Sequence, residues 1–255
     1  INDVVAQTRT FVDFGFREIV LTGVDIGDWH DGDVRLPQLI EQILRKTEIH
    51  RLRLSSLEPP GLSTELIDII ASEPRIAPHL HIPFQSASDE VRQAMKRPKY
   101  DIAHIVQIIS DLRSKRSNLC FGTDIIVGFP AESDTDFAKT VDLLKSGEIA
   151  YAHLFRFSPR PGTEANNLEN LLPYSMSRRM EILQKIDLEN RTNFAQKFVG
   201  QIMNGIVEKC SPNGIYGHTD NYIHFYATGD AKRGSIVKVL AMRAGSMQIY
   251  GEVVS

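Results

Sequence analysis

Apolar residues recur with two different periods along the first two thirds of the chain. Apolar positions three or four residues apart predict helices, whereas short apolar or alternating segments predict strands. The predicted helices cover residues 4–14, 36–45, 63–70, 89–95, 102–113 and 134–145, and the predicted strands cover residues 18–23, 51–57, 79–83, 120–127 and 149–157. This repeated alternation of strand and helix predicts parallel strands with crossover helices, in an open sheet or a barrel.

The pattern changes after Phe157. A loop rich in proline and asparagine, Ser158 to Pro173, precedes a long amphipathic helix that we expect at residues 175–194. Beyond Phe198, short alternating segments are separated by glycines, which predicts a small β-barrel. We therefore expect two domains: a catalytic α/β barrel with a C-terminal helix in residues 1–197, and an all-β barrel in residues 198–255.

Composition narrows the class of protein. The 255 residues are 42% hydrophobic and 24% charged with a formal net charge of -3, which excludes a disordered chain. The sequence has no apolar run long enough to span a bilayer and no signal peptide, so we expect a cytoplasmic monomer without membrane contact. The only cysteines, Cys120 and Cys210, exclude a disulfide framework or a multi-thiolate metal site. Because residue 1 is Ile, we expect the chain to begin inside a longer protein.

Polar residues follow each predicted parallel strand. In such barrels the functional groups gather at the C-terminal ends of the strands. The alternative is that strand ends become polar only because they emerge into loops. Asp124 interrupts a buried strand and needs a partner or a ligand, and the turn Gly128-Phe129-Pro130 could offer backbone amides to an adenosine or carboxylate group. A turn glycine and a paired aspartate would explain the same residues.

Two histidines, His79 and His81, share one face of a predicted strand. With Asp124 and His153 on later strands they could bind a metal, which would suit a metal-dependent barrel hydrolase. Histidines that are only hydrogen-bonded inside the barrel are the alternative. Arg160 lies in a proline-stiffened loop that suits a carboxylate or phosphate, or is simply a structural loop.

Aromatic and basic residues are interleaved in the last sixty residues. Aromatic side chains on a small β-barrel can stack on bases while cations meet phosphates. We expect half or more of the aromatic residues to fill the barrel instead. The residues are Tyr216, Tyr222, Phe225, Tyr226 and Tyr250, among Lys209, His218, Lys232, Arg233 and Lys238.

Five segments together resemble the radical-SAM methylthiotransferases. They cover residues 18–27, 53–59, 79–86, 123–130 and 157–163, in the order found in that family and over nearly the whole chain. The tail, with Gly200, Gly217, Thr219, Tyr222 and Gly251, resembles the tRNA-binding TRAM domain of the same family. Residues 22–24 and 79–83 look most like the enzymes that act on N6-threonylcarbamoyladenosine (t6A) at position 37 of tRNA.

The resemblance implies a partial parallel (β/α) barrel of the radical-SAM type that holds S-adenosylmethionine (SAM), followed by a small all-β barrel. It also implies two [4Fe–4S] clusters. One reduces SAM to a 5′-deoxyadenosyl radical that abstracts hydrogen from C2 of the adenine, the other is associated with sulfur delivery, and a second SAM supplies the methyl group. The implied partner is tRNA.

The resemblance also implies site residues, although it identifies no catalytic residue. The residues implied to contact SAM are Thr22, Gly23, Ser55, Glu58, Gln85, Ser86, Arg97, Asp124 and Gly128. The residues implied to contact RNA or substrate are Arg160, Tyr222, Lys232 and Arg233.

The cysteines depart from the family pattern. Radical-SAM chemistry needs three thiolates spaced C-x3-C-x2-C, and this sequence contains no such triplet. We expect Cys120 to be a small buried strand residue and Cys210 a barrel residue. In the family the triplet lies upstream of the position of Ile1, so we expect a fragment that is inactive by itself. A noncatalytic RNA-binding remnant is the further alternative.

Overall fold

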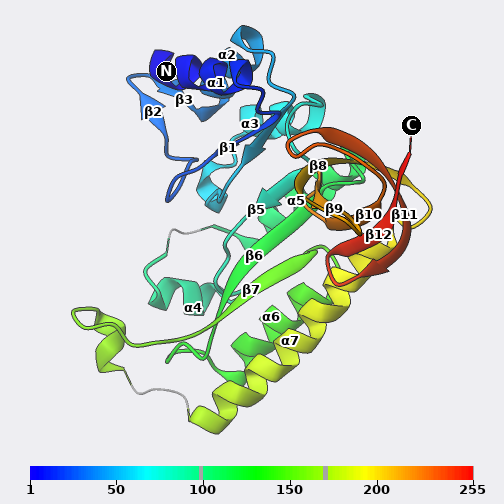
Figure 1. The fold of residues 1–255 in the computed structure, drawn as a ribbon. Coiled ribbons are helices and arrows are strands. Elements are labelled where there is room, and N and C mark those ends of the chain that lie inside the picture. The colour runs from blue at the N-terminus through cyan, green and yellow to red at the C-terminus, as the bar shows by residue number, and fades with distance from the viewer. Residues whose placement is uncertain (98–99, 169–171, 255) are drawn as a thin grey trace.

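The first two thirds of the chain form a curved array of parallel strands covered by helices (Figure 1). The computed structural model describes residues 1–97, 100–168 and 172–254. The parallel strands are β1 (Glu18–Leu21), β4 (Arg51–Leu54), β5 (His79–His81), β6 (Cys120–Val127) and β7 (Tyr151–Arg156). The helices between and around them are α1 (Asn2–Asp13), α2 (Leu36–Lys46), α3 (Thr64–Ser72), α4 (Asp89–Ala94), α5 (Ile102–Lys115) and α6 (Asp134–Lys145), with the 3-10 turn η1 (Pro59–Gly61).

The strands keep their sequence order across the array. β1 pairs with β4, and β5, β6 and β7 form a second parallel sheet. The two sheets are connected by isolated bridges, Leu52 with Ile76 and Ser56 with His81. The structure thus confirms the predicted partial (β/α) barrel.

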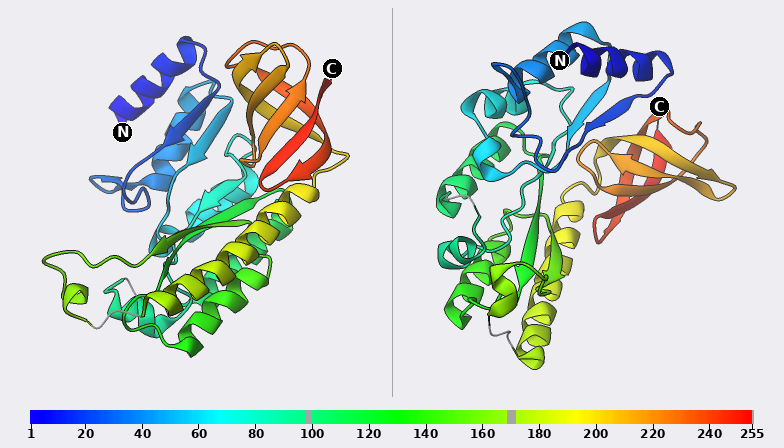
Figure 2. Two further views of the ribbon diagram at one scale, coloured as in Figure 1. Left: turned by 60° about the horizontal axis from the view of Figure 1, so that its bottom comes forward. Right: turned by 90° about the vertical axis from the view of Figure 1, so that its left-hand side faces the viewer.

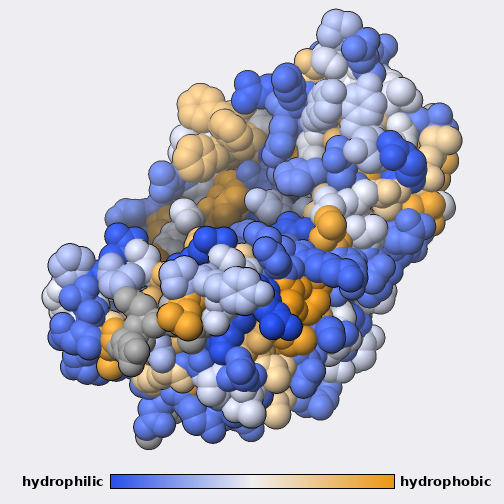
Figure 3. All heavy atoms as spheres, turned by 90° about the horizontal axis from the view of Figure 1, so that it is seen from below, coloured by the Kyte–Doolittle hydropathy of each residue, from blue (hydrophilic) through white to orange (hydrophobic). Residues whose placement is uncertain are grey.

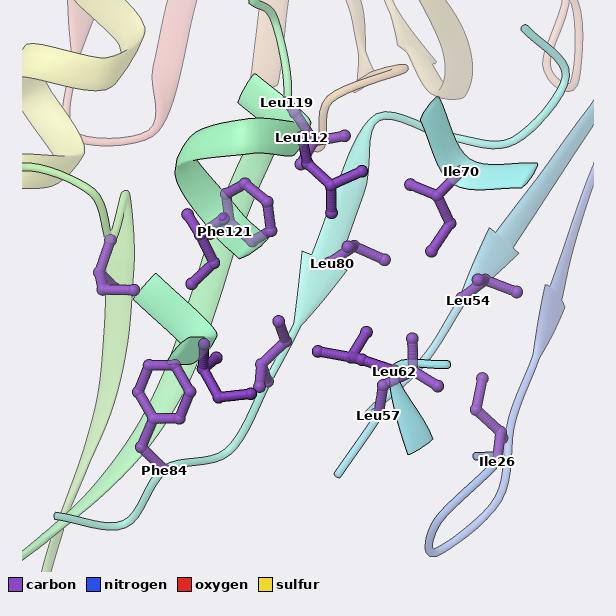
Figure 4. Packing of buried hydrophobic residues seen from close by; sticks show 14 of the residues in the cluster. Ile26, Leu54, Leu57, Leu62, Ile70, Leu80, Phe84, Leu112, Leu119 and Phe121 are labelled. Atoms are coloured by element: carbon purple, nitrogen blue, oxygen red, sulfur yellow. The ribbon is translucent and has the colours of Figure 1, made fainter. Parts of the chain in front are cut away.

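One face of the array forms the hydrophobic core with the helices. Because strand side chains alternate, Leu54, Leu80 and Phe121 all point toward α3 and α5. There they pack with Ile70 and Leu112 in one buried cluster (Figure 4). The strand residues that alternate with these therefore point to the opposite, concave face.

Capping side chains mark the start of several helices. The Ser63 hydroxyl accepts a hydrogen bond from Leu66 N at 3.2 Å and caps α3 as predicted. Ser133 caps α6, whose bounds agree with the predicted ones. The short hairpin of β2 (His30–Asp31) and β3 (Val34–Arg35) was not predicted from the sequence.

The chain then passes through a loop with the 3-10 turn η2 (Glu164–Asn167) into α7 (Pro173–Gln196). Residues 169–171 of the predicted loop lie outside the described residues. α7 lies along α6 and β7, and its C-terminal end reaches the last strands (Figures 1 and 2).

The last part of the chain is a closed five-stranded barrel, as predicted. Its strands are β8 (Ile202–Ser211), β9 (Gly214–Thr219), β10 (His224–Thr228), β11 (Ile236–Gly245) and β12 (Gln248–Val254), in the order β10-β12-β11-β8-β9. The ring of Phe225 fills its interior because Gly205 and Gly217 have no side chain. A Cβ at Gly217 would lie 2.9 Å from Phe225 Cε1.

The two barrels share a core. Cys120, Ala150 and Tyr151 belong to the same buried cluster as Phe225 and its neighbours in the closed barrel. A division at residue 197 stays a prediction, and these contacts indicate that the parts on either side of it pack as one body.

The surface seen from below Figure 1 is mainly hydrophilic and is hollowed between the lobes of the molecule (Figure 3). Among the described residues, no helix is long and apolar enough to cross a membrane.

Candidate active site

The concave face of the parallel strands carries polar side chains that contact one another. His79 and His81 both lie on this face of β5 and are buried, as the alternation predicted. Asp124 of β6 and His153 of β7 are paired in register on the neighbouring strands. His81 Nε2 lies 3.0 Å from Asp124 Oδ1, and His153 Nδ1 lies 3.2 Å from the same oxygen. The partner that Asp124 was expected to need is thus this pair of histidines.

Tyr151 connects the two histidines of β5. Its hydroxyl oxygen lies 2.8 Å from His79 Nε2 and 3.3 Å from His81 Nδ1. The ring reaches them by crossing Gly122 of β6. A Cβ at Gly122 would lie 2.5 Å from Tyr151 Cε1 and closer still to Cζ and the hydroxyl oxygen. Glycine at position 122 is therefore required for this arrangement.

The ionisation of Asp124 restricts the proton positions in this network, because a carboxylate can only accept. Burial would raise the pKa of Asp124, but the hydrogen bonds from His153 and His81 outweigh it and hold that pKa well below its usual range. His81 donates Nε2–H to the ionised Asp124 carboxylate, and the neutral tautomer with that proton accepts at Nδ1 from the Tyr151 hydroxyl. Burial, with the nearby Arg53 charge, lowers the pKa of His79 well below its usual value. Neutral His79 donates Nε2–H to the Tyr151 oxygen and completes the chain.

A second polar cluster closes the N-terminal end of the parallel strands. Glu18 of β1 accepts hydrogen bonds from Arg53 Nε at 2.9 Å and Arg51 Nη1 at 3.1 Å. It also contacts His218 Nε2 of the closed barrel at 2.9 Å. Burial would raise the pKa of Glu18, but the bonds from His218 and Arg53 dominate and lower it. The closed barrel is thus joined to this end by the contact between His218 and the buried Glu18 carboxylate.

Tyr222 lies at the contact between the two barrels. Its ring stacks on His79 with centroids 4.5 Å apart, and the Arg53 guanidinium lies 5.0 Å from the ring centroid. Its φ of 67° is in the left-handed region, which a tyrosine seldom adopts. This conformation places the Tyr222 ring between His79 and Arg53 of the parallel barrel. The contact of Tyr222 with RNA stays a prediction.

Several residues predicted to contact SAM gather at the C-terminal ends of β1 and β4. Thr22 and Gly23 border a cavity of about 500 Å³ between α1 and β1. Ser55 Oγ is buried and has no hydrogen-bond partner among the described residues, so a polar ligand group can bind it. Glu58 and Arg97 form an ion pair with each other. The contact of these residues with SAM stays a prediction, and the unpartnered Ser55 hydroxyl is the observation that suits a polar ligand.

The predicted SAM contacts near β5 and β6 are largely engaged in local structure. Gln85 has a φ of 64°, and its backbone N donates to Asp124 O at 2.8 Å. Ser86 is buried, and its hydroxyl accepts from Ser88 N at 3.1 Å. The expectation of an open amide at Gly128 is wrong, because Gly128 N donates to Glu132 Oε2 at 3.0 Å. That turn is closed by its own glutamate.

The remaining residues predicted to contact RNA are exposed and lie in two different loops. Arg160 lies in the loop after β7, and Lys232 and Arg233 lie in the turn before β11. Neither Gly122 nor the bridging role of Tyr151 was predicted from the sequence. A glycine in the middle of a buried strand was the available signal, because it marks a close approach by another group.

The expectation that half or more of the tail aromatics fill the closed barrel is wrong. Only Phe225 among the five is buried, at 1% exposure. Three tyrosines instead form a row in register across β9, β10 and β12, with ring centroids 4.7 Å apart for the first pair and 6.5 Å apart for the second. A basic residue lies in register at each end of the row. In order the row is Lys209, Tyr216, Tyr226, Tyr250 and Arg243.

The two cysteines do not make an iron–sulfur site. Cys120 is buried between the barrels as expected, and burial raises the pKa of its thiol to about 12. Cys210 is exposed on β8, where its Sγ contacts Ala231 O at 3.2 Å. A thiol buried in the core and another on the outside of the closed barrel cannot ligate one cluster.

Comparisons with known proteins agree with this architecture. The threonylcarbamoyladenosine tRNA methylthiotransferase MtaB of Thermotoga maritima is 35% identical over 82% of this chain and 48% of its own length. The tRNA-2-methylthio-N(6)-dimethylallyladenosine synthase of Coxiella burnetii is 33% identical over 99% of this chain and 60% of its own length. The chain thus spans about half to three fifths of these relatives.

Solved structures share the fold at low identity. Coproporphyrinogen III oxidase HemN from Escherichia coli, a radical SAM enzyme, superposes with a TM-score of 0.54 at 15% identity, covering 76% of this chain and 45% of HemN. The methyltransferase TsrM of Kitasatospora setae, solved with cobalamin and a [4Fe–4S] cluster, gives 0.52 at 15% identity, covering 64% of this chain and 30% of TsrM. Residues 1–144, more than half of the chain, match the radical SAM superfamily. The chain therefore belongs to the radical SAM superfamily.

Proposed function

We propose that this chain is the barrel and C-terminal part of a tRNA methylthiotransferase that acts on t6A at position 37. The observation that carries the proposal is the 33–35% identity to tRNA methylthiotransferases, which in the Coxiella burnetii relative extends through the closed barrel to 99% of the chain. The reaction replaces the hydrogen at C2 of the modified adenine with a methylthio group.

Members of this family use SAM and iron–sulfur clusters. When bound, SAM supplies the radical and the methyl group. In this chain Ser55, with its unpartnered hydroxyl, and the ends of β1 and β4 would hold SAM. The two cysteines of this chain cannot ligate one cluster together. The radical step therefore requires cluster ligands from residues outside these 255.

The choice of t6A rests on the residues at 22–24 and 79–83. Relatives acting on threonylcarbamoyladenosine and on dimethylallyladenosine match with nearly the same identity, 35% and 33%. Identity alone therefore does not separate the two substrates, and the test has to compare them.

Disruption of the gene in the source organism tests the function. Digested tRNA is analysed by liquid chromatography and mass spectrometry for the methylthiolated and unmodified forms of t6A and of dimethylallyladenosine. We expect methylthio-t6A to disappear while t6A accumulates, and the intact gene to restore it. Loss of methylthio-dimethylallyladenosine instead would assign the other substrate. Unchanged methylthiolation of both nucleosides in the disrupted strain would favour the noncatalytic remnant.

The row of tyrosines across the closed barrel supports tRNA as the partner. Three half-exposed rings between Lys209 and Arg243 can stack on unpaired bases while the cations contact phosphates. The Arg243 guanidinium lies 3.9 Å from the centroid of the Tyr250 ring and adds a cation at this end of the row.

Binding of an anticodon stem–loop RNA, measured by fluorescence anisotropy, tests this surface. Each base stacked on a tyrosine contributes about 1–3 kcal/mol, so Tyr216→Ala with Tyr226→Ala should weaken binding by roughly tenfold or more. The phenylalanine versions keep the rings and should bind like the parent. Tyr174→Ala, at an exposed tyrosine on α7, is the matched control. Equal affinity of the double-alanine variant and the parent would exclude the row as the RNA contact.

A further inference from the structure

The two histidines and the aspartate on the concave face have the composition of an open metal site. We propose that His81 Nε2, Asp124 Oδ1 and His153 Nδ1 bind one divalent transition-metal ion of the Zn²⁺ or Fe²⁺ type. This inference is independent of the proposed tRNA function, and it assigns a binding site without making the chain a hydrolase.

The spacing of the three atoms supports the proposal. All three lie within 4.8 Å of one another. Ligand atoms about 2.1 Å from one ion, at angles of roughly 90–110°, lie about 3.0–3.4 Å apart. The two distances to Asp124 Oδ1, 3.0 Å and 3.2 Å, fall within that range. Two imidazoles and one carboxylate form the donor set of open zinc and non-haem iron sites.

The surrounding residues can orient the ligands. A metal-bound imidazole normally donates its other N–H to a fixed acceptor. With the ion on His81 Nε2, Nδ1–H would donate to the Tyr151 oxygen, and the Tyr151 hydroxyl would donate to His79 Nε2. The three groups already lie at the required distances of 2.8 Å and 3.3 Å.

This reversal of the hydrogen bonds has a cost. His79 Nδ1 is buried and has no partner among the described residues. In the reversed chain it would carry an N–H without an acceptor, which weakens metal affinity by on the order of tenfold or more. We therefore expect micromolar binding rather than the nanomolar affinity of a closed structural site.

An ion can reach the site from the concave side. The His153 side chain is 53% exposed and that of Asp124 is 23% exposed, whereas His81 is buried beneath them. The ion would keep its remaining coordination positions on this open side, for water or for an oxygen ligand.

Titration of the tag-free, chelator-treated 255-residue chain with Co²⁺, followed by competition with Zn²⁺, tests the proposal. The visible absorption of Co²⁺ reports nitrogen ligation and coordination number. We expect one ion per chain with micromolar affinity and a higher melting temperature when Zn²⁺ is present. His153→Ala and Asp124→Asn should each weaken binding by more than the roughly 10- to 100-fold typical of a change outside the ligand shell. Tyr151→Phe should weaken it within that range.

His104→Ala is the matched control, because His104 is exposed on α5 and away from the site. It should bind like the parent. His153→Ala should also keep the parent's melting temperature without metal, since that side chain is half-exposed. Absence of stoichiometric binding, or equal affinity of His153→Ala and the parent, would show that the three residues are only a hydrogen-bonded network and overturn the proposal.

Discussion

Gly122→Ala tests the internal arrangement of the parallel barrel most sharply. The added Cβ would lie 2.5 Å from Tyr151 Cε1 and nearer still to Cζ and the hydroxyl oxygen. Real carbon–carbon contacts are about 3.5–4.0 Å, so the Tyr151 ring must move by roughly 1 Å or more. That movement breaks the hydrogen bonds to His79 and His81 and leaves a buried hydroxyl unpaired.

The expected cost combines two effects. Overpacking a core costs about 1–3 kcal/mol, and an unpaired buried polar group costs a further ~1–3 kcal/mol. We therefore expect Gly122→Ala to lower the free energy of unfolding by about 2–6 kcal/mol. Urea denaturation followed by circular dichroism measures it, provided that the m-value is unchanged.

A double-mutant cycle separates the clash from a general effect of alanine in a strand. In a Tyr151→Leu background the ring is absent, so Gly122→Ala should cost less than about 1 kcal/mol. A cost of the same size in both backgrounds would refute the reasoning, as would a Gly122→Ala protein as stable as the parent.

Three further predictions concern stability. His79 binds a proton less readily in the folded than in the unfolded protein, so the free energy of unfolding should fall as the pH drops below about 6.5, by roughly 1.4 kcal/mol per pH unit at most. His79→Gln should flatten this pH dependence, and an unchanged slope in that variant would contradict the prediction. Arg179→Ala leaves buried Glu132 without its partner at 2.6 Å and should lower the free energy of unfolding, measured by urea denaturation, by about 3–5 kcal/mol. A loss below 1 kcal/mol would show that water solvates Glu132 in the variant. Ser63→Ala removes the α3 cap and should lower stability by about 1 kcal/mol, while Ser63→Asp should retain it.

The elements of the parallel barrel could be predicted because their burial follows a simple period. α2 has Leu39, Ile40 and Ile43 on one buried face, and Ser133 marks the start of α6 at the expected residue. The hairpin of β2 and β3 has two residues per strand, too few to establish an alternation.

The candidate site could be predicted only in part. Alternation places His79 and His81 on one face, and it places Asp124 among the inward residues of β6. The role of Tyr151 depends on a contact across Gly122 with a residue 72 positions away in sequence, which no local pattern encodes. The prediction of which aromatic residues fill the closed barrel failed for a related reason. Alternation shows which side chains share a face, but it does not identify which face is inside. The narrow interior of the closed barrel holds Phe225 over two glycines, so Tyr216 and Tyr226 lie outside.

Reaction of the full-length protein, reconstituted with its clusters and SAM, tests whether the enzyme methylthiolates t6A. Two tRNA substrates are compared, one carrying t6A at position 37 and the other dimethylallyladenosine, and the products are identified by mass spectrometry. We predict that a methylthio group replaces the C2 hydrogen of t6A and that one 5′-deoxyadenosine forms for each hydrogen removed. Formation of 5′-deoxyadenosine without any methylthiolated tRNA nucleoside would contradict the claim.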